Sequence, residues 1–438
     1  MAKQIHEIRD PLYGFIHLTT EERRVLNSRP VQRLRNIHQL GLTYLVFPSA
    51  THRRFEHSLG VMEIATKVFD TVTAAHRRHP KIEDFLPELA SPEKVQAGRT
   101  VVRMAALCHD LGHLPFSHAG EQLLPAGTFH EELSKILIES EEMQELWEQL
   151  PSRPRAEDIA KIALGPDKFP APLTDWERIL SEIVTGDVLG ADRMDYLLRD
   201  AYHSGVGYGR FDHLRLVEGI RLLPQPADGE QIEVIAPALG IEEGSMAAAE
   251  SLLLARRAMF TQVYHHHVPL AYNRHLQDFL SAWLPGGQFE RNVAAHLSMD
   301  DNRVLTAMQD CAGDRSPAGA AADRILRRKH FKRLYSVGPN DRRSEDPLEN
   351  VETLESLTEA IAEEFGEENV RYFRKPVRGG KLDFPVHRHN NQVISSLKIS
   401  EILSRLPEPM IEVVFIEPSL HERALRWLND HQSGILAA

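Results

Sequence analysis

The sequence predicts a mainly α-helical protein with a smaller α+β region towards its C-terminus. Apolar residues recur at steps of three and four from residue 54 to about 79, the period of an amphipathic helix. Residues 99–111 (RTVVRMAALCHDL) are apolar almost all round, as in a buried helix. After an N-terminal strand–turn–strand, strand-like runs occur only late in the chain, in VRYFRKP (370–376) and MIEVVFIEP (410–418).

The first elements are predicted from turn and capping residues. Residues 1–18 are expected to form a strand, a turn and a strand. The sequence Thr19-Thr20-Glu21-Glu22 is a capping signal for a helix, and residues 30–39 predict a second short helix. Residues 41–53 are expected to form a loop, and Gly112 is expected to stop the buried helix.

Further helices and one domain boundary are expected beyond this point. Helical stretches are predicted at 117–124, 129–150, 175–203 and 243–282, and the Pro-rich segment 150–174 is predicted as a loop. The glycine pair in LPGGQ (284–288) predicts a boundary between a helical body over 1–285 and an α+β lobe over 286–438. Within the lobe, AGDRSPAGAAAD (312–323) and SVGPNDRRSEDP (336–347) predict weakly structured segments.

Composition excludes several classes of protein. Apolar residues make up 42% of the chain and charged residues 26%, as in an ordinary globular protein. The net charge of −12 argues against broad binding of nucleic acid or of a membrane surface. No apolar run is long enough to span a membrane, and MAKQIHEIRD does not resemble a secretory signal. Two cysteines, Cys108 and Cys311, cannot build a disulfide framework, so a reducing, cytoplasmic location is expected.

Histidine is the residue type that suggests chemistry. The chain has 23 histidines, and many lie before residue 131. His109 and Asp110 stand at the end of the apolar helix, where burial of both groups is costly unless each finds a partner. A metal cation is one such partner, and a hydrogen-bonded His–Asp pair is the alternative.

Two other fragments supply further donors. RFEHSLG (54–60) adds His57, and ADRMDYLLRD (191–200) adds Asp192 on a helix face shared with Tyr196 and Asp200. Taken alone, that second face is equally compatible with a solvated helix that forms ion pairs with neighbouring arginines. Two imidazoles and two carboxylates would suit Mn, Fe, Zn or Mg rather than a metal that needs thiolates.

A second set of histidines lies next to the first. His118 and Glu121 are one helical turn apart, so the carboxylate can orient the imidazole and make it a better general acid. His113 and His130 flank this pair in the sequence. The alternative for His118 and Glu121 is an ordinary surface or capping pair.

The order and surroundings of these residues resemble the HD-domain phosphohydrolases, and more narrowly the deoxynucleoside triphosphate (dNTP) triphosphohydrolases. The resemblance covers most of 1–285, through QRLRNIHQLGLTYLVFPSATHRRFEHSLGV (32–61), HDLGHLPFSH (109–118), TFHEELS (128–134) and DRMDYLLRDAYHSG (192–205). RRKHFKRLYSVG, FRKP and NNQV resemble the same family's C-terminal lobe. The resemblance implies an HD-domain helical core and the reaction of a dNTP with water to give a deoxynucleoside and inorganic triphosphate.

The resemblance also implies roles for the histidine clusters. His57, His109, Asp110 and Asp192 would bind a divalent transition metal (Fe, Mn or Zn), which activates a water for attack on the α-phosphorus, and Mg would accompany the phosphates. His118 would be the general acid, and Glu121 would orient it, at a position where the family more often has Asp. His113 and His130 would contact the α-phosphate or a second metal.

Substrate contacts are implied in the same way. The phosphate chain would be bound by Arg54, Arg193 (Lys in mammalian members), Tyr196 and Arg256. The sugar 3′ hydroxyl would be bound by Gln39 and Asp200, and the sugar 2′ side would be contacted by Leu40 and Tyr264. The residue near the base would be His266.

The family also implies partners beyond the substrate. The basic run RILRRKHFKRLY (324–335) and the N-terminal strand–turn–strand correspond to regions that bind effector nucleotides between subunits. A homo-oligomer, dimer or tetramer, is therefore expected. Arg9 stands where the mammalian enzyme has Asn, and this difference bears on effector binding.

Three alternative functions would have different requirements, and the sequence argues against the first. A zincin-like protease would need a glutamate where Asp110 stands and an unbroken helix through Gly112 and Pro115. A nucleotide sensor could keep the fold without turnover. Another HD-type enzyme, a nucleotidase or phosphodiesterase, would release orthophosphate or pyrophosphate instead of triphosphate.

Overall fold

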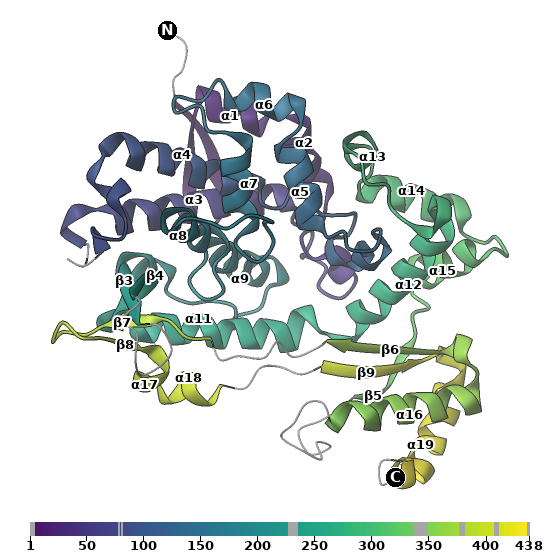
Figure 1. Cartoon of the computed structure of the whole chain (residues 1–438). Coiled ribbons are helices and arrows are strands. Elements are labelled where there is room, and N and C mark those ends of the chain that lie inside the picture. The colour runs from purple at the N-terminus through teal and green to yellow at the C-terminus, as the bar shows by residue number, and fades with distance from the viewer. Residues whose placement is uncertain are drawn as a thin grey trace.

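A mainly helical body carries a smaller α+β lobe in the computed structural model, as the sequence predicts (Figure 1). The structure describes residues 5–77, 79, 82–226, 235–336, 349–375, 382–406 and 411–435. The helices are α1 Thr20–Leu26, α2 Arg29–Arg33, α3 Arg54–Thr73, α4 Pro92–Cys108, α5 His130–Ile138, α6 Glu141–Trp147, α7 Ala156–Leu164, α8 Asp175–Thr185, α9 Ala191–Ser204, α10 His213–Gly219, α11 Met246–Met259, α12 His267–Trp283, α13 Val293–Leu297, α14 Asp301–Cys311, α15 Pro317–Leu326, α16 Glu349–Phe365, α17 Ser396–Ile399, α18 Glu401–Arg405 and α19 His421–Ile435. The strands are β1 Ile5–Asp10, β2 Gly14–Thr19, β3 Ile220–Pro226, β4 Ile235–Glu242, β5 Lys332–Ser336, β6 Val370–Lys375, β7 Pro385–His387, β8 Val393–Ser395 and β9 Ile411–Ile416.

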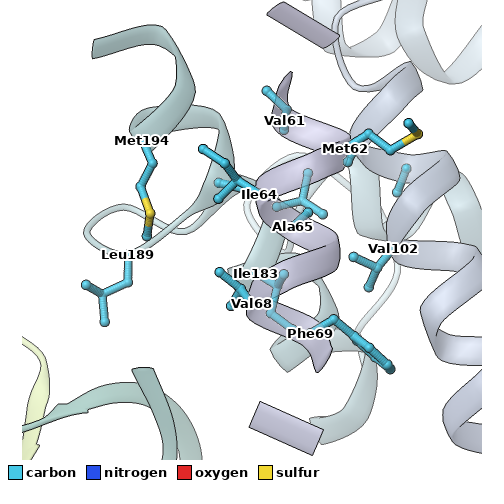
Figure 2. Packing of buried hydrophobic residues seen from close by; sticks show 14 of the residues in the cluster. Val61, Met62, Ile64, Ala65, Val68, Phe69, Val102, Ile183, Leu189 and Met194 are labelled. Atoms are coloured by element: carbon cyan, nitrogen blue, oxygen red, sulfur yellow. The ribbon is translucent and has the colours of Figure 1, made fainter. Parts of the chain in front are cut away.

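Helix α3 is the centre of the body. Its apolar residues repeat at helical spacing and are buried along its length, including Val61, Ile64 and Val68. Helices α4, α8 and α9 pack around it, and Figure 2 shows side chains from these helices meeting those of α3. The elements that carry the histidine motifs are therefore held by one continuous hydrophobic core.

The N-terminal hairpin confirms the strand–turn–strand prediction from residue 5 onwards. Strands β1 and β2 pair antiparallel, with Ile8 opposite Ile16. The Asp10 carboxylate accepts hydrogen bonds from the backbone N–H groups of Leu12 and Tyr13 and so closes the turn. Thr19 and Glu22 then form the expected capping box of α1.

Several helix boundaries differ from the sequence prediction. The buried helix ends at Cys108, so His109 is its C-cap residue and Asp110 lies beyond it. Residues 117–123 form a 3₁₀ rather than an α-helix, and the stretches predicted at 129–150 and 175–203 are each broken into two helices. Gly186 and Gly190 lie at the second break, where backbone atoms approach closely.

Two segments predicted as loops contain helices. Helix α7 lies within the Pro-rich segment 150–174, because Ile159, Ile162 and Ala163 form a buried apolar face. Helix α15 starts inside 312–323, where the Ser316 hydroxyl caps its first turn. The other segment predicted as weakly structured, 336–347, lies outside the described residues after Ser336.

The expectation that strand-like runs follow residue 285 is wrong for β3 and β4, which pair antiparallel inside the helical body. Prolines at 224 and 237 make both runs poor strand candidates by sequence. Strand β7 then pairs parallel to β4, giving the sheet order β3-β4-β7-β8, so residues 385–395 return to the body (Figure 1).

The predicted late strands are confirmed as β6 and β9. They form a second sheet, in the order β5-β9-β6, against which α16 and α19 pack. Helix α12 contacts β5 and so connects this lobe to the body. The division at residue 285 stays a prediction. Within the described residues, the structure has no helix both long and apolar enough for a membrane span.

Candidate metal centre and active site

Four predicted ligands converge from three segments of the body. His57 lies on α3, His109 and Asp110 follow α4, and Asp192 is in the first turn of α9. The His57 Nε2 atom is 3.0 Å from Asp192 Oδ1 and 3.5 Å from Asp110 Oδ2. The His109 Nε2 atom is 3.3 Å from Asp110 Oδ1 and 3.5 Å from Asp192 Oδ1.

The imidazoles of His57 and His109 are each oriented by a hydrogen bond at Nδ1, on the side away from the cluster. The His57 Nδ1 atom is 2.8 Å from Asp195 Oδ2, and the His109 Nδ1 atom is 2.8 Å from the Ala106 carbonyl oxygen. Each contact places a proton on Nδ1 and turns Nε2 towards the cluster, which is how metal-binding histidines are commonly held. The Nε2 atom of His109 is buried and makes no hydrogen bond. A divalent cation fits this donor set.

The charge balance of the cluster also suits a cation. Burial opposes charge on His57, but Asp192, Asp195 and Asp110 outweigh burial and raise its pKa to about 10. Burial would raise the pKa of Asp192, but contacts with His109 and His57 hold it below its usual value. The carboxylates therefore stay ionised, and a metal would compete with protons for the imidazoles.

A buried ion network behind His57 was not foreseen from the sequence. Asp195 accepts hydrogen bonds from the Tyr13 hydroxyl (2.7 Å) and from Arg199 Nε and Nη2 (2.9 Å each). Arg199 also donates to Asp10 at 2.9 Å, and its side chain is fully buried. The turn of the N-terminal hairpin is thus connected to a candidate metal ligand. The spacing of Asp195 and Arg199, one helical turn apart, was the available signal.

The second histidine cluster assembles around one carboxylate. Glu121 Oε1 is 2.8 Å from His118 Nδ1 and 2.6 Å from His130 Nδ1. The ring of His113 stacks on His130 with centroids 4.0 Å apart, and His113 Nε2 is 3.2 Å from Asp110 Oδ1. His113 therefore connects the two clusters, while the His118 side chain is 67% exposed and can reach a bound molecule.

Electrostatics distinguish these groups. Burial raises the pKa of Glu121, but His118 and His130 together lower it well below its usual value. Burial and the positive charge of Arg54 hold the pKa of His113 well below that of an exposed histidine. Glu121 is therefore an acceptor for its two histidine partners, and His113 is a neutral ring.

Unpartnered buried polar atoms are found on three residues expected to bind substrate. They are Oε1 of Gln39, Nε and Nη1 of Arg193, and Nε of Arg256. Arg54 differs, because it pairs with Asp110 and donates from Nε to Ser117 Oγ at 2.9 Å. The structure thus places Arg54 against Asp110, a candidate metal ligand, and against the loop that leads into His118.

The expected sugar contacts also come together. Asp200 Oδ1 is 2.7 Å from His52 Nε2, and Asp200 Oδ2 accepts a hydrogen bond from the Tyr264 hydroxyl at 2.8 Å. Tyr264 ends a π-helical turn, Phe260–Tyr264, a local distortion that is frequent at functional sites. Its ring lies edge-on to Tyr196, with centroids 6.1 Å apart. His52 was not foreseen from the sequence.

Leu40 and His266 lie at the edges of the expected site. Leu40 is partly buried against the main core. The His266 Nδ1 atom accepts a hydrogen bond from the Val268 N–H and caps α12, and its ring lies edge-on to Phe47 with centroids 6.0 Å apart. Their roles towards substrate stay predictions.

A helical core that buries a His–Asp pair with two further N/O donors is the arrangement of an HD domain with a candidate metal centre. Comparison with known families agrees: the profile described as HD domain matches residues 54–178, and that described as HD associated region matches 211–371. The two matches span the segments that carry both clusters and the expected substrate residues.

The chain is also similar to individual proteins. The crystal structure of a hypothetical protein from Aquifex aeolicus superposes with a TM-score of 0.75 at 32% identity, covering 97% of this chain and 100% of that one. An uncharacterized Methanocaldococcus jannaschii protein is 36% identical over 59% of this chain and 46% of its own length. The deoxynucleoside triphosphate triphosphohydrolase SAMHD1 of Gallus gallus is 34% identical over 75% of this chain and 56% of its own length.

The chain spans about half the length of the curated relatives it matches. It belongs to the HD-domain proteins, in which an HD associated region follows the HD domain.

Proposed function

We propose that the protein is a metal-dependent dNTP triphosphohydrolase, which converts a dNTP and water into a deoxynucleoside and inorganic triphosphate. The observation that carries this proposal is the adjacency of two clusters with different capabilities. A cation-binding group around His57 and Asp192 is joined through Asp110 and His113 to an acid–base group around Glu121. Hydrolysis at the α-phosphorus needs both functions.

The metal ligands in this proposal are His57, His109, Asp110 and Asp192, and the metal is Fe, Mn or Zn. When bound there, a divalent cation lowers the pKa of a water and attracts phosphate oxygens. His118 protonates the departing 5′ oxygen, because its exposed ring is held through Nδ1 by Glu121 and keeps Nε2 free to face substrate.

The remaining residues bind and orient the substrate. Arg193 and Arg256 offer unpartnered nitrogens to the phosphates, beside Tyr196, and the phosphates bring Mg. Asp200 and Gln39 accept or donate at the sugar 3′ hydroxyl. The other assignments are Arg54 at the phosphate chain, His113 and His130 at the α-phosphate or a second metal, Leu40 and Tyr264 at the sugar 2′ side, and His266 near the base.

Product analysis tests the proposal. Purified protein is incubated with each dNTP and NTP in the presence of Mn, Mg or Fe, and the products are separated. Inorganic triphosphate with the deoxynucleoside is the expected result. Orthophosphate or pyrophosphate would instead favour a nucleotidase or phosphodiesterase. Binding of nucleotide without turnover by the metal-loaded protein would favour a sensor.

The metal assignment has its own measurement. Elemental analysis of the wild type should give near-stoichiometric transition metal, and a variant carrying both His109→Ala and Asp110→Ala should lose most of it. Equal metal content in the two proteins would refute the ligand set, whatever the products are.

We also propose that the protein works in the cytoplasm as a homo-oligomer, dimer or tetramer, that binds an effector nucleotide at a subunit interface. Family relatives support this, together with the basic run at 324–335. Light scattering with and without nucleotides tests it. A mass near that of the 49.7 kDa monomer under both conditions would refute it.

A further inference from the structure

The loop that leads into His118 has an uncommon backbone conformation. Phe116 and Ser117 both have positive φ angles, 56° and 63°. Side chains other than glycine and asparagine rarely adopt this left-handed region, so two in succession require contacts that hold them there. His118 follows directly, and its direction therefore depends on these contacts.

The contact on Phe116 comes from a distant part of the chain. The backbone N–H of Phe116 donates to Oδ1 of Asp301 at 2.6 Å. Asp301 is the first residue of α14 and is only 1% exposed. It belongs to the segment after residue 285, and neither the sequence motifs nor the proposed mechanism uses it.

The same carboxylate holds a second active-site segment. Oδ2 of Asp301 accepts a hydrogen bond from the backbone N–H of His38 at 2.8 Å and is 2.6 Å from His38 Nδ1. The ring of His38 stacks on those of Tyr44 and Phe116, with centroids 5.0 and 5.9 Å apart. Gln39, an expected sugar contact, is the next residue along the chain.

Ser117 joins this arrangement to the metal centre. Its hydroxyl donates to the His38 carbonyl oxygen at 2.7 Å and accepts from Arg54 Nε at 2.9 Å, while Arg54 pairs with Asp110. A continuous chain of polar contacts therefore leads from Asp301 to a candidate metal ligand.

We infer that Asp301 is a positioning residue, which clamps the left-handed turn at Phe116–Ser117 onto His38 and so fixes the directions of His118 and Gln39. Only an ionised carboxylate offers acceptors to both backbone N–H groups at once. An asparagine must turn its NH₂ group towards one of them. The expected catalytic effect of Asp301 rests on the proposed function, whereas the clamp itself does not.

The experiment compares Asp301→Asn with Asp300→Asn. Asp300 precedes it and caps α14 by accepting from the Arg303 N–H at 2.9 Å, a role that asparagine performs equally well. Hydrogen–deuterium exchange is measured over residues 36–40 and 112–121. Asp301→Asn should accelerate exchange in both segments by about 10-fold or more, and Asp300→Asn should leave both unchanged.

Turnover adds a readout that a purely structural role would not move. Asp301→Asn should lower kcat for dNTP hydrolysis by about 100-fold, the cost of a misplaced catalytic group. KM should rise as well, because Gln39 is an expected sugar contact, whereas bound metal should change by less than about 3-fold, because the four candidate metal ligands contact one another.

Each result separates the clamp from the proposed function. Unchanged exchange at 112–121 in Asp301→Asn would overturn the clamp, and unchanged kcat with increased exchange would overturn its positioning role. If the variant does not fold, exchange in the wild type decides: rapid exchange of the Phe116 amide would overturn the clamp. If the wild type releases no triphosphate from any dNTP, the proposed function fails and the exchange data still decide the clamp.

Discussion

Gly60→Ala is expected to disturb the candidate metal centre although residue 60 is not one of its candidate ligands. Gly60 lies on α3 against α9, and a Cβ added there would overlap Oδ1 of Asp195 and Nη2 of Arg199. Relief needs a movement of about 1 Å, because a Cβ keeps roughly 3.0 Å from other heavy atoms. The movement must displace the carboxylate that orients His57.

The expected effects follow from that displacement. Crowding a packed core destabilises a protein by about 1–3 kcal/mol, and loss of a partner behind a ligating histidine weakens metal binding about 10–100-fold. Chemical denaturation measures the first effect. Titration of the metal-loaded protein with a competing chelator measures the second.

Gly98→Ala is the matched control. Gly98 is buried on α4, and a Cβ there would lie 2.7 Å from the Trp176 ring, remote from the histidines. It should lose stability and keep wild-type metal affinity. If Gly60→Ala binds metal as tightly as the wild type, or if both variants lose affinity equally, the argument from close helix packing is refuted.

Three further expectations concern other parts of the molecule. His118→Ala should lower kcat by about 10²–10⁴-fold with metal content unchanged, and near-normal turnover would assign the proton to another histidine. Tyr264→Phe, which loses a 2.8 Å hydrogen bond to Asp200, should raise KM for dNTPs more than it lowers kcat, as steady-state kinetics can show. Glu22→Gln should make the free energy of unfolding depend less on pH in the acid range. Burial disfavours the Glu22 carboxylate, but Arg103 outweighs burial and lowers its pKa. Its stabilising contribution is therefore present above pH about 4.5 and lost as pH falls below that value, so denaturation at pH 3–7 should show a shallower loss in the variant.

Local sequence patterns predicted the parts of the site that are close in the chain or on one helix face. His109 and Asp110 stand out because polar groups follow an apolar helix, and the His118–Glu121 contact follows from one turn of separation. The structure brings these residues together with His57 and Asp192. Their chemical roles remain proposals.

Contacts between distant segments could not be predicted in this way. Asp301 is separated from Phe116 by 185 positions, and no periodicity connects them. Strands β3 and β4 were not predicted because each contains prolines, which are uncommon inside strands. The parallel partner of β4 is β7, which lies far away in the sequence. Helix α7 was missed because the prolines that flank it outweighed its short apolar face.

The parallel pairing of β4 with β7 has a consequence for how the chain folds as it is made. Strand β4 ends at Glu242 and its partner begins at Pro385, so synthesis of the intervening chain takes roughly 7–30 s at about 5–20 residues per second. During that interval the end of β4, at Ile241 and Glu242, lacks its partner strand, and an unpaired strand edge favours pairing with another chain. This sheet can therefore be completed only after the residues from 385 onwards have been made.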